Sequence, residues 1–191
     1  MINVILASKS PIRKTMMEKA KIPFEIIVTN ADETPDLSKT FEDQLKDISM
    51  RKAKVVFRQT IDKGERIIVA ADQKIVFENL MYGKPKTINE ARTLIKLMEG
   101  SRNIYSYVGN SIIYANNETI IKTINNCDIA RMYMDNITDD ELENYLANNQ
   151  PLTKCGGINI VDADFLHLED GKMSTAIGMT VEYLQQLLSS L

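Results

Sequence analysis

Short apolar runs alternate with amphipathic stretches along this chain, and that alternation predicts a mixed α/β fold. Three apolar runs in the first part of the chain predict strands: Ile2–Ala7, Phe24–Val28 and Arg66–Ala71. Between the first two strands, Ser10 suits a helix N-cap and Pro11 suits the first helical position, where a missing N–H costs nothing. Between the last two, Phe41–Val56 carries apolar residues at helical spacing and predicts an amphipathic helix.

The second half of the chain continues the same alternation. The segments Thr87–Glu90 and Thr138–Glu141 fit the capping-box pattern and predict two helix starts, and the first of these helices is expected to end before Gly100. The β-rich stretch Ile104–Met134 is expected to turn at Asn116–Asn117. The predicted C-terminal elements are strands at Ile158–Val161 and Phe165–Leu168, a turn at Glu169–Gly171 and a helix over Val181–Leu188.

Composition indicates an ordinary globular protein. The chain has 191 residues, of which 44% are hydrophobic and 26% charged, enough to bury one good core or two small lobes. We find no repeat, low-complexity tract or linker, so residues 1–191 are expected to form one domain, with two lobes around one cleft as an option. The formal net charge of −3 argues against binding to a nucleic-acid polymer, which requires an excess of Lys and Arg.

The ends and the cysteines give an expected location. The apolar run after Met1 is too short to span a membrane and lacks a charged leader and a cleavage site, so we expect a cytoplasmic protein that does not bind membranes. Cys127 and Cys155 have no metal-site spacing. We expect both to be reduced thiols, although the sequence does not decide whether they meet in the fold.

The first candidate for chemistry is Ser8–Arg13, where a strand gives way to a helix start. Free backbone N–H groups and the helix dipole favour an anion there, and Arg13 adds a bidentate donor for phosphate oxygens. The alternative is a plain N-cap with a solvated arginine. No glycine-rich phosphate loop occurs in the chain.

The second candidate is Lys52. At 100° per residue it falls near the middle of the apolar stripe of the Phe41–Val56 helix, whereas Arg51 and Lys54 project sideways. A lysine at that angle either snorkels to the edge of the core or reaches an anion in a ligand site.

Two carboxylates and one further lysine complete the candidates. Asp72 ends the apolar run Arg66–Ala71, where an α/β protein usually binds ligands, and it would serve as a metal ligand or general base or merely cap a turn. Glu33 would supply an oxygen ligand to Mg or Mn, or belong to a polar turn. Gly83–Pro85 is expected to be a tight turn that presents Lys84, with a plain surface hairpin tip as the alternative.

Other chemistries are poorly supplied. His167 is the only histidine, so a histidine-based zinc site or a Ser–His relay would lack residues, and a structural role is favoured. Cys155 precedes two glycines and has no histidine near it in sequence, so we favour a backbone turn over a nucleophile.

Taken in order, these motifs resemble the Maf (septum-formation) nucleoside triphosphate pyrophosphatases. The resemblance is carried by the following segments: Ile5–Arg13 as I-L-A-S-x-S-P-x-R, Asp32–Pro35 as D-E-T-P, Arg51–Ala53 as R-K-A, Ala70–Gln73 as A-A-D-Q, Gly83–Pro85 as G-K-P, and Pro151–Gly156 as P-L-x-K-x-G. It extends over essentially the whole chain, and its N-terminal half is the more specific.

The resemblance implies a fold, an activity and a site. The fold would be a mixed, elongated, twisted sheet flanked by helices with a central nucleotide-binding cleft, as in Maf and ITPase proteins, often as a homodimer. The activity would be hydrolysis of a nucleoside triphosphate to the monophosphate and pyrophosphate with Mg or Mn. The implied roles are phosphate binding by Ser8, Ser10, Arg13 and Lys52, metal binding by Glu33 and Asp72, and catalysis by Asp72, as activator of the water, and Lys84.

Substrate choice is where this chain departs from the relatives that it resembles. Family members specific for dTTP and UTP usually have Arg, Thr and Gln where this chain has Ile12, Gln73 and Val161. The group that resembles 7-methyl-GTP pyrophosphatases shares Gln73 and the D-E-T-P segment, although it has an aromatic residue in place of Ile12 and a Glu in place of Val161. We predict a 7-methyl-GTP-like, modified substrate over dTTP or UTP. The alternative function is a nucleotide-binding regulator of cell division or septum formation on the same scaffold that has lost turnover.

Overall fold

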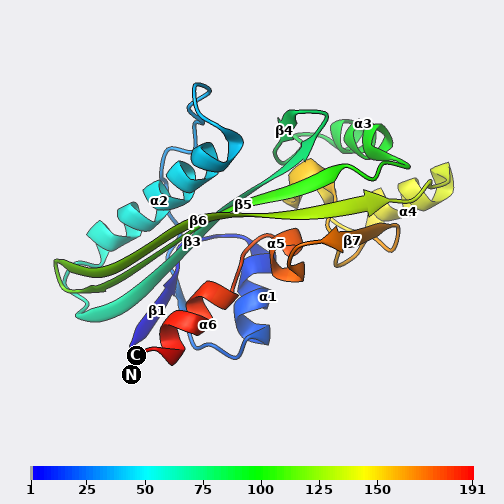
Figure 1. Ribbon diagram of the computed structural model, residues 1–191. Coiled ribbons are helices and arrows are strands. Elements are labelled where there is room, and N and C mark those ends of the chain that lie inside the picture. Colours follow the sequence, from blue (N-terminus) through cyan, green and yellow to red (C-terminus); the bar gives the residue numbers. More distant parts are fainter. Residues whose placement is uncertain (1) are drawn as a thin grey trace. The chain divides into compact units, whose positions relative to one another are not determined.

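The computed structural model describes residues 2–191 and shows a mixed α/β fold (Figure 1). Seven strands form one sheet in the order β2-β1-β3-β5-β6-β7, with β4 paired to β3. The strands are β1 (Asn3–Leu6), β2 (Glu25–Ile26), β3 (Glu65–Phe77), β4 (Leu80–Tyr82), β5 (Ile104–Asn116), β6 (Thr119–Met134) and β7 (Leu166–Asp170). The helices are α1 (Pro11–Lys19), α2 (Phe41–Gln59), α3 (Ile88–Met98), α4 (Asp139–Asn148), α5 (Met173–Ile177) and α6 (Glu182–Ser189), with 3₁₀ turns η1 (Pro151–Thr153) and η2 (Cys155–Gly157).

The chain folds into two compact units. The first unit comprises Met1–Asp72, Val108–Asp128 and Gly178–Leu191, and the second comprises Gln73–Tyr107 and Ile129–Ile177. The strand β1 pairs in parallel with both β2 and β3, whereas β3 with β4 and β6 with β7 are antiparallel, so the sheet is mixed as predicted. None of the helices within residues 2–191 is long and apolar enough to cross a membrane.

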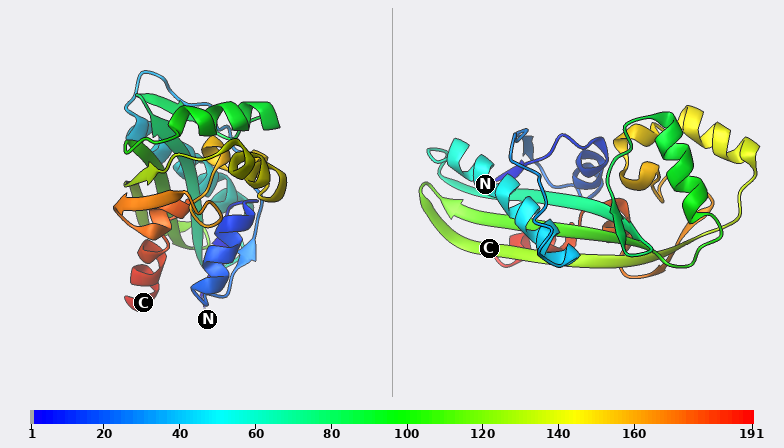
Figure 2. Two further views of the ribbon diagram at one scale, coloured as in Figure 1. Left: turned by 90° about the vertical axis from the view of Figure 1, so that its right-hand side faces the viewer. Right: turned by 90° about the horizontal axis from the view of Figure 1, so that it is seen from above.

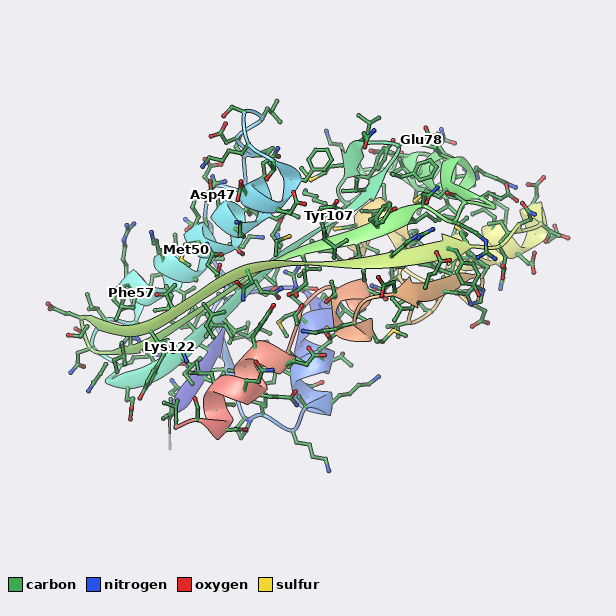
Figure 3. All side chains as sticks on the ribbon, viewed as in Figure 1. Asp47, Met50, Phe57, Glu78, Tyr107 and Lys122 are labelled. Carbon is green, nitrogen blue, oxygen red and sulfur yellow. The ribbon has the colours of Figure 1, made fainter. Side chains whose placement is uncertain are left out.

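Helices cover both faces of the strands in the first unit. The helix α2 lies on one face, and α1 and α6 lie on the other (Figures 1 and 2). Ala53 and Val56 of α2 pack against Ile68 and Ala70 of β3, in a core that also contains residues of β1 and β5. Met50 and Phe57, labelled in Figure 3, are partly buried against this core. The apolar stripe read from the sequence is therefore the face of α2 that packs on the sheet.

The approach of α2 to β5 depends on a glycine. A Cβ atom built on Gly109 would lie 2.2 Å from the carbonyl oxygen of Leu45 and 2.9 Å from the backbone nitrogen of Lys46. No real Cβ contact is that short, so only glycine lets the backbones of the helix and the strand meet here. Gly109 thus fixes how closely α2 is held against the sheet.

Most predicted helix starts are confirmed by their caps. Thr138 accepts a hydrogen bond from Glu141 N and forms the full capping box with the Glu141 side chain. Thr87 accepts from Glu90 N, but the Glu90 carboxylate accepts from Lys86 N instead of from Thr87 N. Ser10 occupies the N-cap of α1 with Pro11 next to it, yet the Ser10 side chain makes no capping bond. The capping patterns in the sequence therefore placed the starts of these helices to within about one residue.

One prediction for the C-terminal region is wrong, and one helix there was not predicted. The segment Ile158–Val161 is not a strand: its residues lie in an irregular stretch that follows η2, and Val161 is half exposed. The apolar run is explained by burial of Ile158 against the core of the second unit without any strand partner. The short helix α5 was not predicted, because five residues hold too little periodicity to indicate a helix.

Candidate functional site

Asp72 lies inside β3, not at its end as we predicted. The strand continues through Asp72 to Phe77, where it turns back and pairs with β4. Polarity at Asp72 and Gln73 suggested a boundary, but backbone pairing with a neighbouring strand carries the strand onward. Because side chains alternate along a strand, Asp72 shares a face with Ile68 and Ala70, which pack against α2. Its carboxylate is therefore buried on the α2 side, with the residue 6% exposed.

Lys52 reaches an anion and does not snorkel. Its side chain is 8% exposed, and its Nζ lies 2.6 Å from Asp72 Oδ1 and 3.1 Å from Glu33 Oε2. Ala53 and Val56, on the same face of α2, bury apolar side chains against the sheet, so Lys52 extends the packed face by one polar position. The two carboxylates and the ammonium form one cluster, which we call the Glu33–Lys52–Asp72 cluster.

Glu33 reaches this cluster from an exposed loop between β2 and α2. Arg51 holds the residues on either side of Glu33: its Nη2 donates to Thr34 O at 2.7 Å and its Nη1 lies 3.3 Å from Asp32 Oδ2. Asp32 Oδ1 also accepts from Thr34 N at 2.9 Å, which closes a tight turn around Glu33. Sequence reasoning missed this role, although Arg51 stands directly before Lys52 and a sideways-pointing arginine was the available signal.

Ser8, Ser10 and Arg13 form a second cluster in the first unit. Ser8 Oγ accepts from Ser10 N at 3.1 Å and from Arg13 Nη1 at 3.4 Å. Arg13 is 9% exposed, and its Nε donates to Gly178 O at 3.0 Å. The arginine is thus a buried side chain with backbone and hydroxyl partners, not the solvated residue of the plain N-cap alternative. Ile12 beside it is half-buried.

Strand register relates the two clusters. Leu6 of β1 lies opposite Val69 of β3, and Ala7 N donates to Val69 O at 2.8 Å. Ser8 therefore follows the end of β1 while Asp72 lies three residues beyond Val69 on the adjacent parallel strand. Neighbouring strands are about 4.8 Å apart, so the chain brings both groups to the same end of β1. This is the carboxyl end, where α/β sheets place ligands.

In the second unit, three motifs that are distant in sequence meet. Gly156 N donates to Gly83 O at 2.8 Å, and Cys155 Sγ donates to Gln73 O at 2.9 Å. The Gln73 amide donates from Nε2 to Ser106 Oγ at 2.9 Å and to Ala176 O at 3.1 Å. The G-K-P segment that carries the exposed Lys84, the position after Asp72 and the late P-L-x-K-x-G segment are therefore one structural cluster.

The predicted turn at Gly83–Pro85 is not a hairpin tip. The turn between β3 and β4 is made by Glu78 and Asn79, both with positive φ, and Glu78 is labelled in Figure 3. Gly83 follows β4 and has no positive φ, so unusual backbone angles do not explain why a glycine occupies this position. A Cβ atom there would lie 2.9 Å from Lys74 Nζ, so the glycine instead leaves room for this lysine.

Val161 is a half-exposed residue of the second unit that is held by its more buried neighbours. Asn159 Oδ1 accepts from Val161 N at 3.1 Å, and Asn159 N donates to the Tyr145 hydroxyl at 3.2 Å. Lys154 forms an ion pair with Asp162 next to that hydroxyl. Burial and Asp162 raise the pKa of Tyr145 well above its usual range, so the hydroxyl stays protonated and can donate. Sequence reasoning did not find this support.

Two carboxylates are available to hold a metal ion. Within residues 2–191 no group of three or more Asp, Glu, His or Cys side chains could enclose one. Glu33 and Asp72 are nevertheless brought together by one ammonium, and Mg²⁺ is commonly bound by one or two carboxylates with waters and substrate phosphates. The donor set therefore fits a hard divalent cation that shares its coordination with a phosphate ligand, and it does not fit a cage made by protein alone.

The histidine and the cysteines have other surroundings. His167 Nε2 lies 2.7 Å from Asp135 Oδ2, and its ring stacks on Tyr133 at 4.7 Å, in keeping with the structural role predicted for it. Cys127 and Cys155 are both free thiols. Burial, with smaller contributions from Glu42 and Asp128, raises the pKa of Cys127 to about 12, so this thiol is a poor nucleophile.

The fold and the site together define an α/β protein in which a buried lysine of the helix α2 lies between two carboxylates. The chain belongs to the Maf family: the sequence profile of the Maf-like protein matches residues 3–191.

Individual relatives match over almost the full chain. A dTTP/UTP pyrophosphatase of Bdellovibrio bacteriovorus is 28% identical over 192 residues, with 97% of each chain covered. A dTTP/UTP pyrophosphatase of Bacillus cereus strain AH187 is 30% identical over 186 residues, covering 96% of this chain and 93% of the relative. The crystal structure of a nucleoside-triphosphatase (dITP/XTP pyrophosphatase) from Mycobacterium abscessus is 14% identical, with a TM-score of 0.42 over 99% of this chain and 94% of that chain.

Proposed function

We propose that this protein is a nucleoside triphosphate pyrophosphatase that hydrolyses its substrate to the nucleoside monophosphate and pyrophosphate. The observation that carries the proposal is the Glu33–Lys52–Asp72 cluster, in which a buried ammonium and two carboxylates meet. A structural ion pair has no need of a second carboxylate that is half exposed and held in place by a separate arginine. Membership of the Maf family and the names of the relatives support the same activity.

In the proposed reaction a water attacks the α-phosphorus in line with the bond to the β-phosphate oxygen. Asp72 accepts the proton of that water as the new P–O bond forms, and the electron pair of the broken bond leaves with pyrophosphate. Lys52 keeps the buried Asp72 carboxylate paired and offers positive charge to the phosphate oxygens. Ser8, Ser10 and Arg13 bind phosphate oxygens, with Arg13 already held by its bond to Gly178 O.

Two assignments rest on the family resemblance as well as on the residues. Glu33 and Asp72 would hold a Mg²⁺ or Mn²⁺ ion, which would act as a Lewis acid on the phosphates. Lys84 of the second unit would neutralise charge that develops on the phosphates during the reaction. The chelator arm of the experiment below tests the first assignment, because the activity should disappear without metal. The same assay on a Lys84→Met variant tests the second, because the activity should fall sharply.

The identity of the base has support in two directions. Gln73 favours a 7-methyl-GTP-like substrate, whereas Val161 offers no hydrogen bond to a base edge and the relatives are named for dTTP and UTP. Both Gln73 amide protons are engaged within the second unit, so the side chain offers its oxygen as an acceptor. This oxygen can accept a hydrogen bond from a ring N–H group of the base, and guanine and uracil both have one. We propose the methylated purine nucleotide and include all of these bases in the test.

The expected assembly and location are also proposals. A homodimer follows from the family resemblance, and light scattering after size exclusion tests it. The cytoplasmic location is the expectation stated from the sequence, and cell fractionation tests it. The central nucleotide-binding cleft stays a prediction that a structure with bound nucleotide would test.

The decisive experiment measures pyrophosphate release from 7-methyl-GTP, GTP, CTP, dTTP and UTP with Mg²⁺, Mn²⁺ or a chelator. The Asp72→Asn variant is compared with Asp62→Asn as a control, because Asp62 is an exposed carboxylate in the turn after α2. We expect metal-dependent release that falls at least about a hundredfold in Asp72→Asn and is unchanged in Asp62→Asn. No release from any substrate, combined with a nucleotide-dependent rise in melting temperature, would replace the proposal with the binding regulator.

A further inference from the structure

Lys74 is a half-buried cation that lies beside the G-K-P segment of the second unit. The register of β3 and β4 pairs Ile75 with Tyr82, so Lys74 and Gly83 are the next opposing positions. The ammonium crosses to Gly83, where a Cβ atom would lie 2.9 Å from Lys74 Nζ. Its aliphatic stem is therefore packed along the strand pair and its charged end is carried to the residue that precedes Lys84.

The structure gives this lysine no protein partner. Within residues 2–191 Lys74 has neither an ion pair nor a hydrogen bond, whereas the buried side chains of Lys52 and Lys154 both contact carboxylates. A partly desolvated ammonium without a counter-ion is unfavourable unless an anion compensates it. The anion that this position would receive is one that also meets the neighbouring Lys84.

The surrounding backbone holds Lys74 in a defined place. Gly83 O is bound by Gly156 N, and Ile75, which follows Lys74, is in contact with Gly156, where a Cβ atom would lie 3.0 Å from the Ile75 side chain. The segment that carries Lys84 and the strand that carries Lys74 are thus fixed against the same turn. Lys74 lies on β3 and Lys84 lies two residues beyond the end of β4, in a segment fixed to the same turn, so both ammonium groups can contact one polyphosphate.

We propose that Lys74 is a second phosphate-binding residue next to Lys84, so that two ammonium groups of this segment bind pyrophosphate. This rests on the proposed function for its biological meaning, but the binding of inorganic pyrophosphate tests it without turnover. Lysine acts here as a point charge on non-bridging oxygens, and no covalent step involves it.

The test is calorimetric titration of inorganic pyrophosphate and inorganic tripolyphosphate into the full-length protein, with Mg²⁺ and with a chelator. Lys74→Met keeps the packed stem and removes the charge, and Lys74→Gln serves as a second variant. Lys86→Met is the matched control, because Lys86 is an exposed lysine of the same segment to which no role is assigned. Unchanged melting temperatures confirm that each variant is folded.

We expect Lys74→Met and Lys74→Gln to bind pyrophosphate about tenfold more weakly, with a shallower dependence on salt, and Lys86→Met to bind like the unmodified protein. Equal affinities in all four proteins overturn the proposal. A loss of the same size in Lys86→Met also overturns it, because only the net charge would then matter. Absence of turnover with intact, Lys74-dependent pyrophosphate binding would instead count against the proposed function and support this site.

Discussion

Removing the charge of Lys52 should destabilise the protein strongly, whatever its activity. In Lys52→Met the methionine keeps most of the side-chain volume, but Asp72 loses the ammonium that lies 2.6 Å from its Oδ1. Asp72 is 6% exposed, so its carboxylate would remain in the interior without a counter-ion. Breaking a buried pair in this way costs about 3–5 kcal/mol of unfolding free energy, mostly through the charge left behind.

The same geometry predicts which related variants are mild. Glu33 has a 56% exposed side chain, so Glu33→Gln should cost less than about 1 kcal/mol. The double variant Lys52→Met/Asp72→Asn leaves no buried charge and should recover most of the loss seen in Lys52→Met. These differences would be measured by urea unfolding at pH 7, followed by circular dichroism and by tyrosine fluorescence, since the chain has no tryptophan. A loss below about 1 kcal/mol in Lys52→Met, or a double variant no more stable than the single one, would refute the reasoning.

Three further predictions concern other parts of the first unit. Arg51→Met should raise the Mg²⁺ concentration for half-maximal activity about tenfold, with little change in the activity at saturating Mg²⁺. Arg58→Met, on the exposed side of α2, should leave this concentration unchanged, and equal effects of the two substitutions would contradict the role given to Arg51. Gly109→Ala should lower the free energy of unfolding by about 2–3 kcal/mol, because the added Cβ would lie 2.2 Å from a carbonyl oxygen of α2. An unchanged melting temperature would contradict this close contact. Burial raises the pKa of Cys127 to about 12, so in a Cys155→Ser background at pH 8.5 this thiol should react with iodoacetamide at least about tenfold more slowly when folded than in urea. Because this folded-state pKa lies above the ordinary value of about 8.5, the linked stabilisation is complete below that value and is lost as the pH rises toward 12; equal alkylation rates would disprove the burial.

Local signals in the sequence predicted the elements well where a cap or a turn marks them. Thr138 forms the capping box that its pattern predicts, and the β5–β6 connection falls within one residue of the predicted turn. The boundary at Asp72 and the strand at Ile158–Val161 were wrong for one reason. Whether a polar residue ends a strand, or an apolar run joins one, depends on which neighbours supply backbone partners, and single-sequence patterns do not contain that information.

The candidate site also separates what local sequence patterns predict from what only the packing of the fold decides. The sequence by itself determined that Lys52 lies on the buried face of its helix, because helical periodicity fixes the angle of each side chain, and the motif order identified Ser8, Arg13, Glu33 and Asp72 as candidates. Only the tertiary structure decided that Lys52 meets Asp72 and Glu33 and that Arg51 holds the Glu33 turn. Periodicity is a property of neighbouring residues, whereas a contact between positions 33, 52 and 72 requires three elements to pack in one arrangement, and the packing of the whole core selects that arrangement.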